Sequence, residues 1–514
     1  MQAPQPSISG TRDYAGEDAV ALQTARDAIE ATLRLYAYAA IDPPILENPL
    51  PFLNRSGEDI RRRMYIFPDP GGREVCLRPE LTIPVCRAYL RQSSLAAGAT
   101  KKSPVARLSY FGPAFTYEPT SEGRYRQFFQ AGAELVGAAA RQAADAEILA
   151  AALDALAAAG LSEPLVEIGD VEIRNAFIDQ LPVSERSKAR IRRIALRNQK
   201  DARLIAPDMN AAEATNEFGE LSALLATIEP DKAELLIREV FALAEVRHVG
   251  GRSPEEIVER LIGRNAQQAE PISAELIEGV MALLNIRGKP AAAFKSIREH
   301  FRKFRIGSIE PVLERCEERL RYIEAYRQQP AALLFNVGLR RGLEYYTGFL
   351  FEIFAKDLPA IGHVCGGGRY DNLLEALGAN APIPAVGFGV GLDRLLLALQ
   401  KTPVHMTRTP PAPQALVVGL AEDRNAECIR ASAALREGGW SVELDVAGRD
   451  ERDALGYAAK RKIAHVVFVG GDNCKKGQVR IRSLAARADR YAAISSLAAY
   501  AKGDTTSGAP ERPL

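Results

Sequence analysis

Cysteine and histidine are both scarce in this chain, and neither is spaced for a metal site or a disulfide framework. The 514 residues include six cysteines and five histidines. No two cysteines form a C-x-x-C pair, and no two histidines stand at ligand spacing. The sequence therefore predicts reduced thiols in a cytoplasmic protein, and no metal centre. The cysteines are Cys76, Cys86, Cys316, Cys365, Cys428 and Cys474.

The chain also lacks a surplus of charge and a long apolar run. Its formal net charge is +1, so no global field favours nucleic acid, although a local binding patch is compatible with the composition. No apolar run approaches the roughly 20 residues that a membrane helix needs. Residues 1–16 lack the basic-then-apolar order of a secretory signal, and we expect them to be a disordered leader.

The common nucleotide-binding fingerprints are absent as well. The sequence contains neither G-x-x-x-x-G-K followed by Ser or Thr, nor G-x-G-x-x-G, which argues against a P-loop and a dinucleotide-binding turn. Three consecutive glycines, Gly366 to Gly368, remove side chains where another group approaches the backbone closely. Taken alone, they are a weak indication of a phosphate site.

Two β-rich stretches separated by a long helical one are present instead, which predicts an α+β core. Four prolines mark a linker after the second stretch, and alternating strands and helices beyond it predict a small α/β domain. The expected parts are a core of residues 17–183 and 330–400, a helical insertion of 184–329, a linker of 401–413, an α/β domain of 414–501 and a disordered tail of 502–514.

The core is organised around a predicted hairpin between residues 106 and 134. Alternation places Arg124, Gln130 and Glu134 on one face of its second arm. Polar side chains on a strand face cost desolvation energy unless they meet water or a polar ligand. Both a ligand-binding face and a solvated face of an antiparallel sheet fit this stretch.

Two other stretches also allow both a ligand-binding and a purely structural interpretation. Glu80 and Thr82 stand where a strand gives way to a helix, and a helix-capping role is the simpler interpretation of them in isolation. Gly387, Gly389 and Gly391 alternate on one strand face, which leaves room for a flat ring or allows close strand packing.

Taken together, five segments resemble the class II histidyl-tRNA synthetase core. The resemblance covers roughly residues 17–180 and 330–400, and residues 414–501 are similar to that family's anticodon-binding domain. It implies a class II synthetase-like antiparallel sheet with helices, and a homodimer. The segments are Arg78-Pro79-Glu80, Gly123-Arg124-Tyr125-Arg126-Gln127-Phe128, Arg341-Gly342-Leu343-Glu344-Tyr345-Tyr346-Thr347-Gly348, Gly367-Gly368-Arg369-Tyr370-Asp371 and Gly391-Leu392-Asp393-Arg394-Leu395.

The resemblance also implies a histidine-binding pocket. Carboxylate and amide oxygens suit an ammonium, an arginine fork suits a carboxylate, and aromatic walls with a polar end suit an imidazole. On this basis Glu80, Thr82 and Gln130 would hold the α-ammonium and Arg341 the carboxylate. Glu134, Tyr345 and Tyr346 would flank the imidazole, and Arg124 and Arg394 are possible ATP phosphate ligands.

One departure from the synthetase pattern decides the leading hypothesis. Where synthetases carry Phe-Arg-Tyr-Glu, this chain has Phe115-Thr116-Tyr117-Glu118. Loss of a cationic fork on the ATP α-phosphate costs about 3 kcal/mol or more in the transition state. The run Leu81-Thr82-Ile83-Pro84-Val85 is similar to a second branch of the family, the regulatory subunit of ATP phosphoribosyltransferase.

We therefore expect a non-catalytic, histidine-binding regulatory subunit with no catalytic residue and no cofactor. Its partner would be the short-form catalytic ATP phosphoribosyltransferase subunit, in the first step of histidine biosynthesis. The alternative is a histidyl-tRNA synthetase that uses ATP with Mg²⁺ and binds tRNA. The retained Arg124, Arg341 and Arg394 favour this alternative, as does the C-terminal domain.

Overall fold

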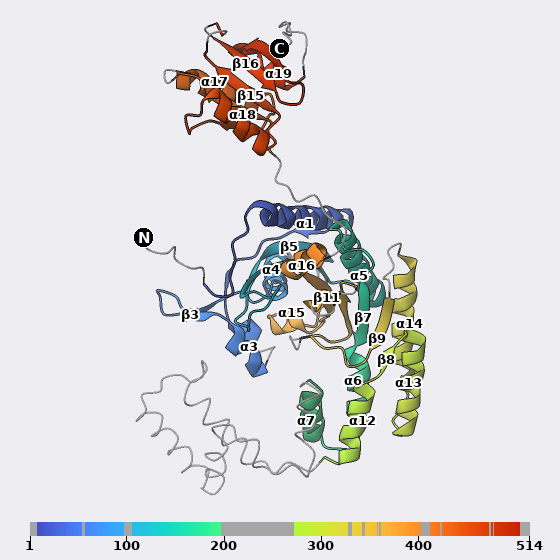
Figure 1. The fold of residues 1–514 in the computed structure, drawn as a ribbon. Helices are drawn as coiled ribbons and strands as arrows, with labels where there is room; N and C mark the ends of the chain where they lie inside the picture. The colour runs from blue at the N-terminus through green and yellow to red at the C-terminus, as the bar shows by residue number, and fades with distance from the viewer. Residues whose placement is uncertain are drawn as a thin grey trace. The chain divides into compact units, whose positions relative to one another are not determined.

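The computed structural model describes most of the chain, which divides into two compact units (Figure 1). The units are residues 1–408 and residues 409–514. Within them the described residues are 8–53, 57–96, 105–196, 272–326, 332–341, 345–356, 358, 361–401, 412–421, 424–471, 474–475 and 477–503. Most of the predicted linker, residues 402–411, lies outside these ranges.

The larger unit is built on a nine-stranded sheet with the order β1-β5-β6-β12-β11-β10-β7-β9-β8. Neighbouring strands are antiparallel except for the pairs β1–β5 and β7–β9. This confirms the predicted α+β core. The strands are β1 (Ala39–Ala40), β5 (Ala106–Phe115), β6 (Gln127–Val136), β7 (Leu165–Asp170), β8 (Arg287–Gly288), β9 (Ala332–Asn336), β10 (Phe349–Phe354), β11 (His363–Arg369) and β12 (Ala385–Gly391).

The predicted hairpin is present as β5 and β6. Their antiparallel register pairs Ala106 with Val136 at one end and Phe115 with Gln127 at the other. Side chains at every second residue of a strand lie on the same face, so Gln130 and Glu134 share one face of the sheet. Alternate residues of β6 point the other way, and the buried Ala131, Ala133 and Leu135 belong to the main apolar core.

Three helices cover that apolar face: α1 (Gly16–Leu35), α5 (Arg141–Ala158) and α16 (Leu392–Lys401). Helix α5 is rich in alanine, and small side chains let a helix approach a sheet closely. Helix α16 follows β12 without a break, so the residues at its start are fixed by the sheet. The opposite, polar face of β6 is left for the pocket described below.

A smaller sheet, in the order β2-β4-β3, lies beside the N-terminal helices. It pairs β3 (Ile66–Pro68) with β4 (Glu74–Leu77) across a turn at residues 69–72, and β2 (Leu46–Glu47) with the other edge of β4. Helices α2 (Leu50–Leu53), α3 (Gly57–Arg63) and α4 (Thr82–Ala96) accompany it. The start of α4 lies next to the large sheet, because the Leu81 N–H directly before it donates to the Gln130 side chain of β6.

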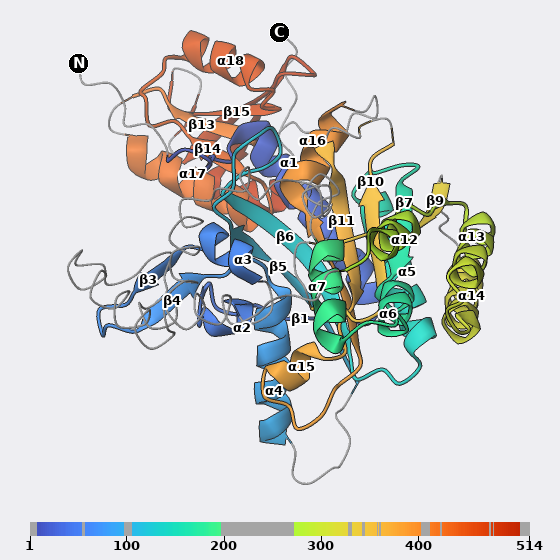
Figure 2. The same cartoon turned by 90° about the horizontal axis from the view of Figure 1, so that it is seen from below.

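The described part of residues 184–329 is mostly helical, but it also contributes strand β8, and much of it packs in the core. Helices α13 (Pro290–Lys303) and α14 (Glu310–Ala325) lie side by side near β8 and β9 (Figures 1 and 2). Their buried side chains join the main apolar cluster, and β8 pairs with β9 in the large sheet. Helices α6 (Val171–Asp179), α7 (Glu185–Leu196) and α12 (Ala274–Leu284) contact one another. Within the predicted helical insertion, the further helices that the sequence pattern indicates at 216–228 and 232–243 lie outside the described residues.

A buried ionic network ties α14 to the sheet. Arg319 donates hydrogen bonds to Asp145 at 2.8 Å and to Asp170 at 3.0 Å. Arg369, at the end of β11, donates to the other oxygen of Asp145 at 2.8 Å and to Asp371 at 2.9 Å. Removing one member of such a network leaves an uncompensated buried charge, which costs about 3–5 kcal/mol.

The smaller unit is an α/β domain with helices on both faces of a five-stranded sheet, which agrees with the predicted α/β architecture. Its strand order is β14-β13-β15-β16-β17, with parallel pairing on the β14 side and antiparallel pairing on the β17 side. Separate apolar clusters lie on the two faces. The elements are β13 (Ala415–Gly419), α17 (Asn425–Glu437), β14 (Val442–Leu444), α18 (Glu451–Lys460), β15 (His465–Val469), β16 (Gln478–Ser483), β17 (Ala488–Ala493) and α19 (Leu497–Ala501).

The expectation of a disordered leader over residues 1–16 is wrong for residues 8–16. Helix α1 begins at Gly16, and the preceding residues make specific contacts with the core. The Tyr14 hydroxyl donates a hydrogen bond to Asp393 of α16, and the Arg126 N–H donates to the Gly10 carbonyl at 2.7 Å. These partners lie far away in sequence, so composition gave no sign of them. Among the described residues, no helix is both long enough and apolar enough to cross a bilayer.

Candidate functional site

A pocket opens on the polar face of β6, between β11, β12, the start of α4 and the segment before β10. Six of the seven side chains that we predicted to bind histidine line it, and the seventh, Glu134, lies directly beneath it. The lining residues are Glu80, Thr82, Phe128, Gln130, Arg341, Tyr345, Tyr346, His363, Val364, Gly366, Tyr370, Gly387, Phe388, Gly389, Gly391 and Arg394.

One end of the pocket, the acidic end, contains Glu80, Thr82, Gln130 and Glu134. The Glu80 carboxylate accepts hydrogen bonds from the backbone N–H groups of Thr82 at 2.6 Å and Ile83 at 2.8 Å. Glu80 is therefore the cap of α4 and a wall of the pocket at once, and the two interpretations of this residue are compatible. Burial raises the pKa of Glu80 to about 7, although the backbone hydrogen bonds oppose the shift.

Glu134 is fully buried and only partly satisfied. The Tyr370 hydroxyl donates a hydrogen bond to Glu134 Oε2, whereas Glu134 Oε1 has no hydrogen-bond partner within the described residues. Burial raises the pKa of Glu134 to about 8, and nearby Glu80 adds to the effect. A buried carboxylate with one vacant acceptor suits a ligand that brings N–H groups.

Two glycines of β12 make space for the acidic side chains. A Cβ at Gly387 would overlap the Glu134 carboxylate, and a Cβ at Gly389 would overlap the Gln130 amide. We expected room for a flat ring or close strand packing, and the space is filled by side chains of the neighbouring strand instead. Gln130 is fixed further because its Oε1 accepts the Leu81 N–H at 3.1 Å.

Aromatic rings form the wall between the two ends. The ring centroids of Tyr345 and Tyr346 are 4.7 Å apart, and Tyr345 meets Tyr370 edge to face at 5.6 Å. Tyr345 and Tyr370 are buried. Such a wall suits a flat ring whose polar atoms point toward the acidic end.

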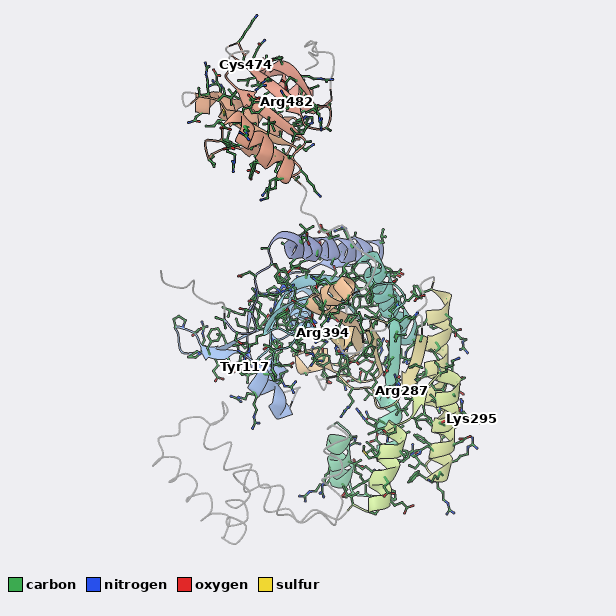
Figure 3. The ribbon with its side chains drawn as sticks, in the orientation of Figure 1. Tyr117, Arg287, Lys295, Arg394, Cys474 and Arg482 are labelled. Carbon is green, nitrogen blue, oxygen red and sulfur yellow. The ribbon has the colours of Figure 1, made fainter. Side chains whose placement is uncertain are left out.

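The opposite, arginine end is formed by Arg341, Arg394, His363 and, at its outer edge, Arg124. The Arg341 guanidinium occupies the space above Gly366, and its Nη1 lies 3.7 Å from Glu352 Oε1. That Nη1 has no hydrogen-bond partner within the described residues. Arg394 Nη1 donates to the His363 carbonyl at 2.8 Å, and Figure 3 labels Arg394 among the elements of the larger unit.

The protonation state of His363 reports how positive this end is. Burial, followed by the charges of Arg341, Arg394 and Arg124, lowers the pKa of His363 to about 2. Its imidazole is therefore neutral at physiological pH. The Nδ1 atom lies 3.2 Å from Glu352 Oε1. Three arginines with few counter-charges, of which Arg341 and Arg394 are half-buried and Arg124 is exposed, suit an anionic ligand.

Thr116, the departure noted in the sequence, does not line the pocket. Its N–H donates to the Arg126 carbonyl at 2.8 Å, which continues the hairpin register beyond Phe115. By that register Thr116 belongs to the same sheet face as Gln130, further along the hairpin. Arg126 does not replace the missing cation, because its Nη1 donates to the Ser9 carbonyl at 3.1 Å and it stacks over Tyr117.

Sequence reasoning missed His363 and Tyr370 as pocket residues. Both flank the triple glycine: His363 begins β11, and Tyr370 directly follows its last residue. The glycines indicated that something approaches the backbone there, and this was the available signal. The approaching groups are the Arg341 guanidinium at Gly366 and, at the next two glycines, the backbone carbonyls of Gly387 and Phe349, followed by side chains of β10 and of Tyr346.

Comparison with known proteins identifies the relatives of this chain. The sequence model described as histidyl-tRNA synthetase matches residues 10–250 and 236–395, and that of the anticodon binding domain matches residues 414–503. A histidine–tRNA ligase of Pyrococcus furiosus is 29% identical over 495 residues, covering 96% of this chain and 98% of the relative. One from Methanocaldococcus jannaschii is 30% identical over 492 residues, with coverages of 95% and 97%.

Solved structures agree on the fold. A protein of Bacillus halodurans, described as an ATP phosphoribosyltransferase regulatory subunit/histidyl-tRNA synthetase, has a TM-score of 0.61 at 23% identity, covering 91% of this chain and all of that one. The histidyl-tRNA synthetase of Nostoc sp. PCC 7120 also has a TM-score of 0.61, at 18% identity, with coverages of 98% and 100%. At these identities the likeness concerns the class II synthetase-like fold alone.

These findings overturn the leading hypothesis from the sequence. The prediction of a non-catalytic regulatory subunit of ATP phosphoribosyltransferase is wrong, because the curated relatives that match nearly the whole chain are histidine–tRNA ligases, and this chain carries an anticodon binding domain. The expected catalytic partner subunit and the role in histidine biosynthesis lose their support with it. The hypothesis depended on Thr116, a single side chain outside the pocket, while Arg341 and Arg394 line it.

Proposed function

Since the chain belongs to the histidyl-tRNA synthetase family, we propose that it is an enzyme that activates histidine with ATP and transfers the histidyl group to tRNA. The observation that carries the proposal is the polarity of the pocket, which has buried carboxylates at one end and arginines at the other. An amino acid bound along this axis places its cationic and N–H groups toward the acidic end and its carboxylate toward the arginines.

At the acidic end, Glu80, Thr82 and Gln130 would hold the α-ammonium. The vacant Oε1 of Glu134 would accept an N–H of the imidazole, with Tyr345 and Tyr346 against the ring. A ligand side chain without a matching donor would leave Glu134 Oε1 unpaired. An unpaired buried acceptor costs free energy, so such a ligand would bind more weakly. We therefore expect histidine to be preferred over isosteric apolar amino acids.

At the arginine end, Arg341 would bind the histidine carboxylate and the negative charge that develops as it attacks the α-phosphorus of ATP. In this step an oxygen–phosphorus bond forms to give histidyl-adenylate, and the bond to pyrophosphate breaks. A tRNA hydroxyl then attacks the activated carbonyl, and AMP leaves. Fixed cations that are already in place lower the barrier to such a step.

Arg394 and Arg124 are the proposed ligands of the remaining ATP phosphates. Arg394 lines the pocket, and Arg124 is exposed at its edge with Nη2 3.5 Å from the Cβ position of Gly362. Mg²⁺ is the expected companion of ATP. The described residues contain no group of three acidic, histidine or cysteine side chains that would hold a metal, so its other ligands would be phosphates and water.

The proposal is tested by histidine-dependent ATP–pyrophosphate exchange on the purified full-length chain, followed by charging of tRNA. We expect exchange that requires histidine and is lost in Arg341→Ala. The matched control is Arg287→Ala, which removes a surface arginine paired with Glu167 outside the pocket. Histidine binding without any exchange would contradict the proposal.

A further inference from the structure

We propose that residues 9–14 form a strap that positions the phosphate-binding arginine end of the pocket, with Tyr14 and Arg12 as positioning residues. This inference rests on the proposed function, because it concerns how the ATP side of the site is held. The strap reaches the pocket through Asp393 and Arg126, and neither of these is a histidine-binding residue in the arrangement above.

Asp393 is the first link. It is 4% exposed and stands at the start of α16, directly before Arg394. Tyr14 donates its hydroxyl hydrogen to Asp393 Oδ1, and Arg12 Nε lies 3.6 Å from the same oxygen. A buried carboxylate needs such partners, so two of its stabilising contacts come from a segment more than 370 residues away in sequence.

Asp393 also bonds to the strand that carries the other pocket residues. Its Oδ2 accepts the backbone N–H of Phe129 at 3.0 Å. Phe128, the preceding residue, lines the pocket, and so does Arg394. The carboxylate therefore joins the strand and the helix whose next residues face the ATP side of the site. Tyr14 packs edge to face on Phe129 with centroids 5.5 Å apart, which fixes the same joint.

The second link holds the hairpin arm that carries Arg124. The Gly10 carbonyl accepts the Arg126 N–H at 2.7 Å, and the Arg126 guanidinium donates to the Ser9 carbonyl at 3.1 Å. Gly10 has φ of +85°, and a Cβ there would lie 2.7 Å from Arg126 Cγ. The close approach requires glycine, since another residue would strain the backbone and displace Arg126.

The strap therefore contacts helix α16, which carries Arg394, and the hairpin arm before β6, which carries Arg124. None of its described contacts involves Glu80, Gln130 or Glu134 at the acidic end. A positioning role thus predicts a selective effect: the handling of ATP changes while histidine binding does not. A purely structural role would change stability or affect both substrates.

The test compares Tyr14→Phe with Tyr36→Phe. Each change removes one hydroxyl that bonds to an aspartate, and Tyr36 bonds to Asp154 at 2.7 Å on the helical face away from the pocket. For Tyr14→Phe we expect KM for ATP in the exchange assay to rise about tenfold, since hydrogen bonds to charged groups are the stronger kind. KM for histidine and the thermal midpoint should match those of Tyr36→Phe.

Gly10→Ala tests the second link in the same assay, with Gly72→Ala as control because Gly72 also has positive φ (+80°) but no close neighbour. We expect a selective rise in KM for ATP in Gly10→Ala alone. An unchanged KM for ATP in both strap variants, or an equal rise for histidine and ATP, would overturn the strap.

Failure of the proposed function is recognised separately. If the wild-type chain shows no exchange, that function fails, and the strap is then tested by direct calorimetric titration with ATP. Weaker ATP binding in Tyr14→Phe than in Tyr36→Phe supports it. Equal binding in the two variants, or no ATP binding by the wild type, overturns it.

Discussion

The two ends of the pocket are held in different ways. Glu80, Gln130 and Glu134 receive hydrogen bonds from neighbouring backbone or from Tyr370, and β12 leaves room for two of them. At the arginine end, Arg341 Nη1 has no hydrogen-bond partner among the described residues, and Arg124 is exposed. Apart from the vacant Oε1 of Glu134, the acidic end is thus held by the protein before a ligand arrives. At the arginine end the ligand would supply the partners of Arg341 Nη1 and of the exposed Arg124. Histidine recognition and phosphate handling should therefore be separable by mutation.

The largest effect is expected from Arg341→Ala. Loss of one preorganised donor to developing negative charge costs about 3–4 kcal/mol, so histidine-dependent exchange should fall by about 10²–10³-fold. The exchange rate at saturating ATP and histidine is the measurement, with Arg287→Ala as the control. A loss below about tenfold would mean that the arginine end is not where charge develops.

Glu134→Gln should act on the opposite end and on the other substrate. The change replaces one acceptor oxygen of the buried carboxyl by an NH2 donor and removes its charge, so the N–H of the imidazole and the Tyr370 hydroxyl compete for the one remaining acceptor oxygen. We expect the dissociation constant for histidine to rise by about 10–100-fold. KM for ATP should stay near the wild-type value. Calorimetric titration with histidine measures this, and Glu163→Gln, at an exposed glutamate, is the control. An effect on ATP alone would reverse our assignment of the two ends.

Thr116→Arg should strengthen phosphate binding at the arginine end of the pocket. Thr116 belongs to the pocket face of the hairpin by register, so an arginine there would add a cation beside the ATP side of the site. We expect exchange to increase by about tenfold, which is a part of what a full phosphate contact contributes. Thr116→Ser keeps the hydroxyl and should leave the rate unchanged. No gain in Thr116→Arg would show that the threonine is not the deficit.

The smallest effect concerns pH. Burial raises the pKa of Glu80 to about 7 and that of Glu134 to about 8 in the empty pocket, so both bind protons that a cationic ligand must displace. Histidine should bind several-fold more tightly as pH rises from 6 to 8.5. The ligand's own imidazole titrates near 6.5, so the measurement is the difference between wild type and Glu134→Gln.

The same pKa shifts predict the stability of the empty protein. A carboxyl whose folded pKa is raised stabilises the fold at low pH, and this contribution is lost as pH rises through the folded value. The thermal midpoint without ligand should therefore fall between pH 5 and pH 8. Added histidine should offset that fall. A midpoint that rises over this interval would show that the two carboxyls are already ionised.

Local patterns were enough to predict the β5–β6 hairpin and the α/β character of the C-terminal unit, because each depends on residues close together in sequence. The positions of the histidine-pocket residues followed from the family resemblance, and the pocket does gather them. What local pattern cannot supply is contact between distant segments. Neither the bond from Tyr14 to Asp393 nor the inclusion of β8 in the large sheet has a signature in composition or periodicity.

The functional error has a similar origin. The predicted loss of catalysis depended on Thr116 alone, although Arg341 and Arg394 also line the site. The pocket further contains a neutral His363, which sequence reasoning did not place there. A missing side chain is informative only when its neighbours are known. The pairing of Thr116 with Arg126 outside the pocket became visible only from the register of the hairpin.

The buried cluster of Asp145, Asp170, Arg319 and Arg369 has a consequence for how this protein is assembled. Its members come from segments spread between residues 145 and 369, and the charges compensate one another only when all are in place. Contacts between such distant segments form slowly, because the loop-closure entropy must be overcome first. The loop that bears Tyr345 and Tyr346 leads into β10, and Arg319 lies over the ring of Phe349 at the start of that strand. We therefore expect the aromatic wall of the pocket to order late in folding, cooperatively with α14.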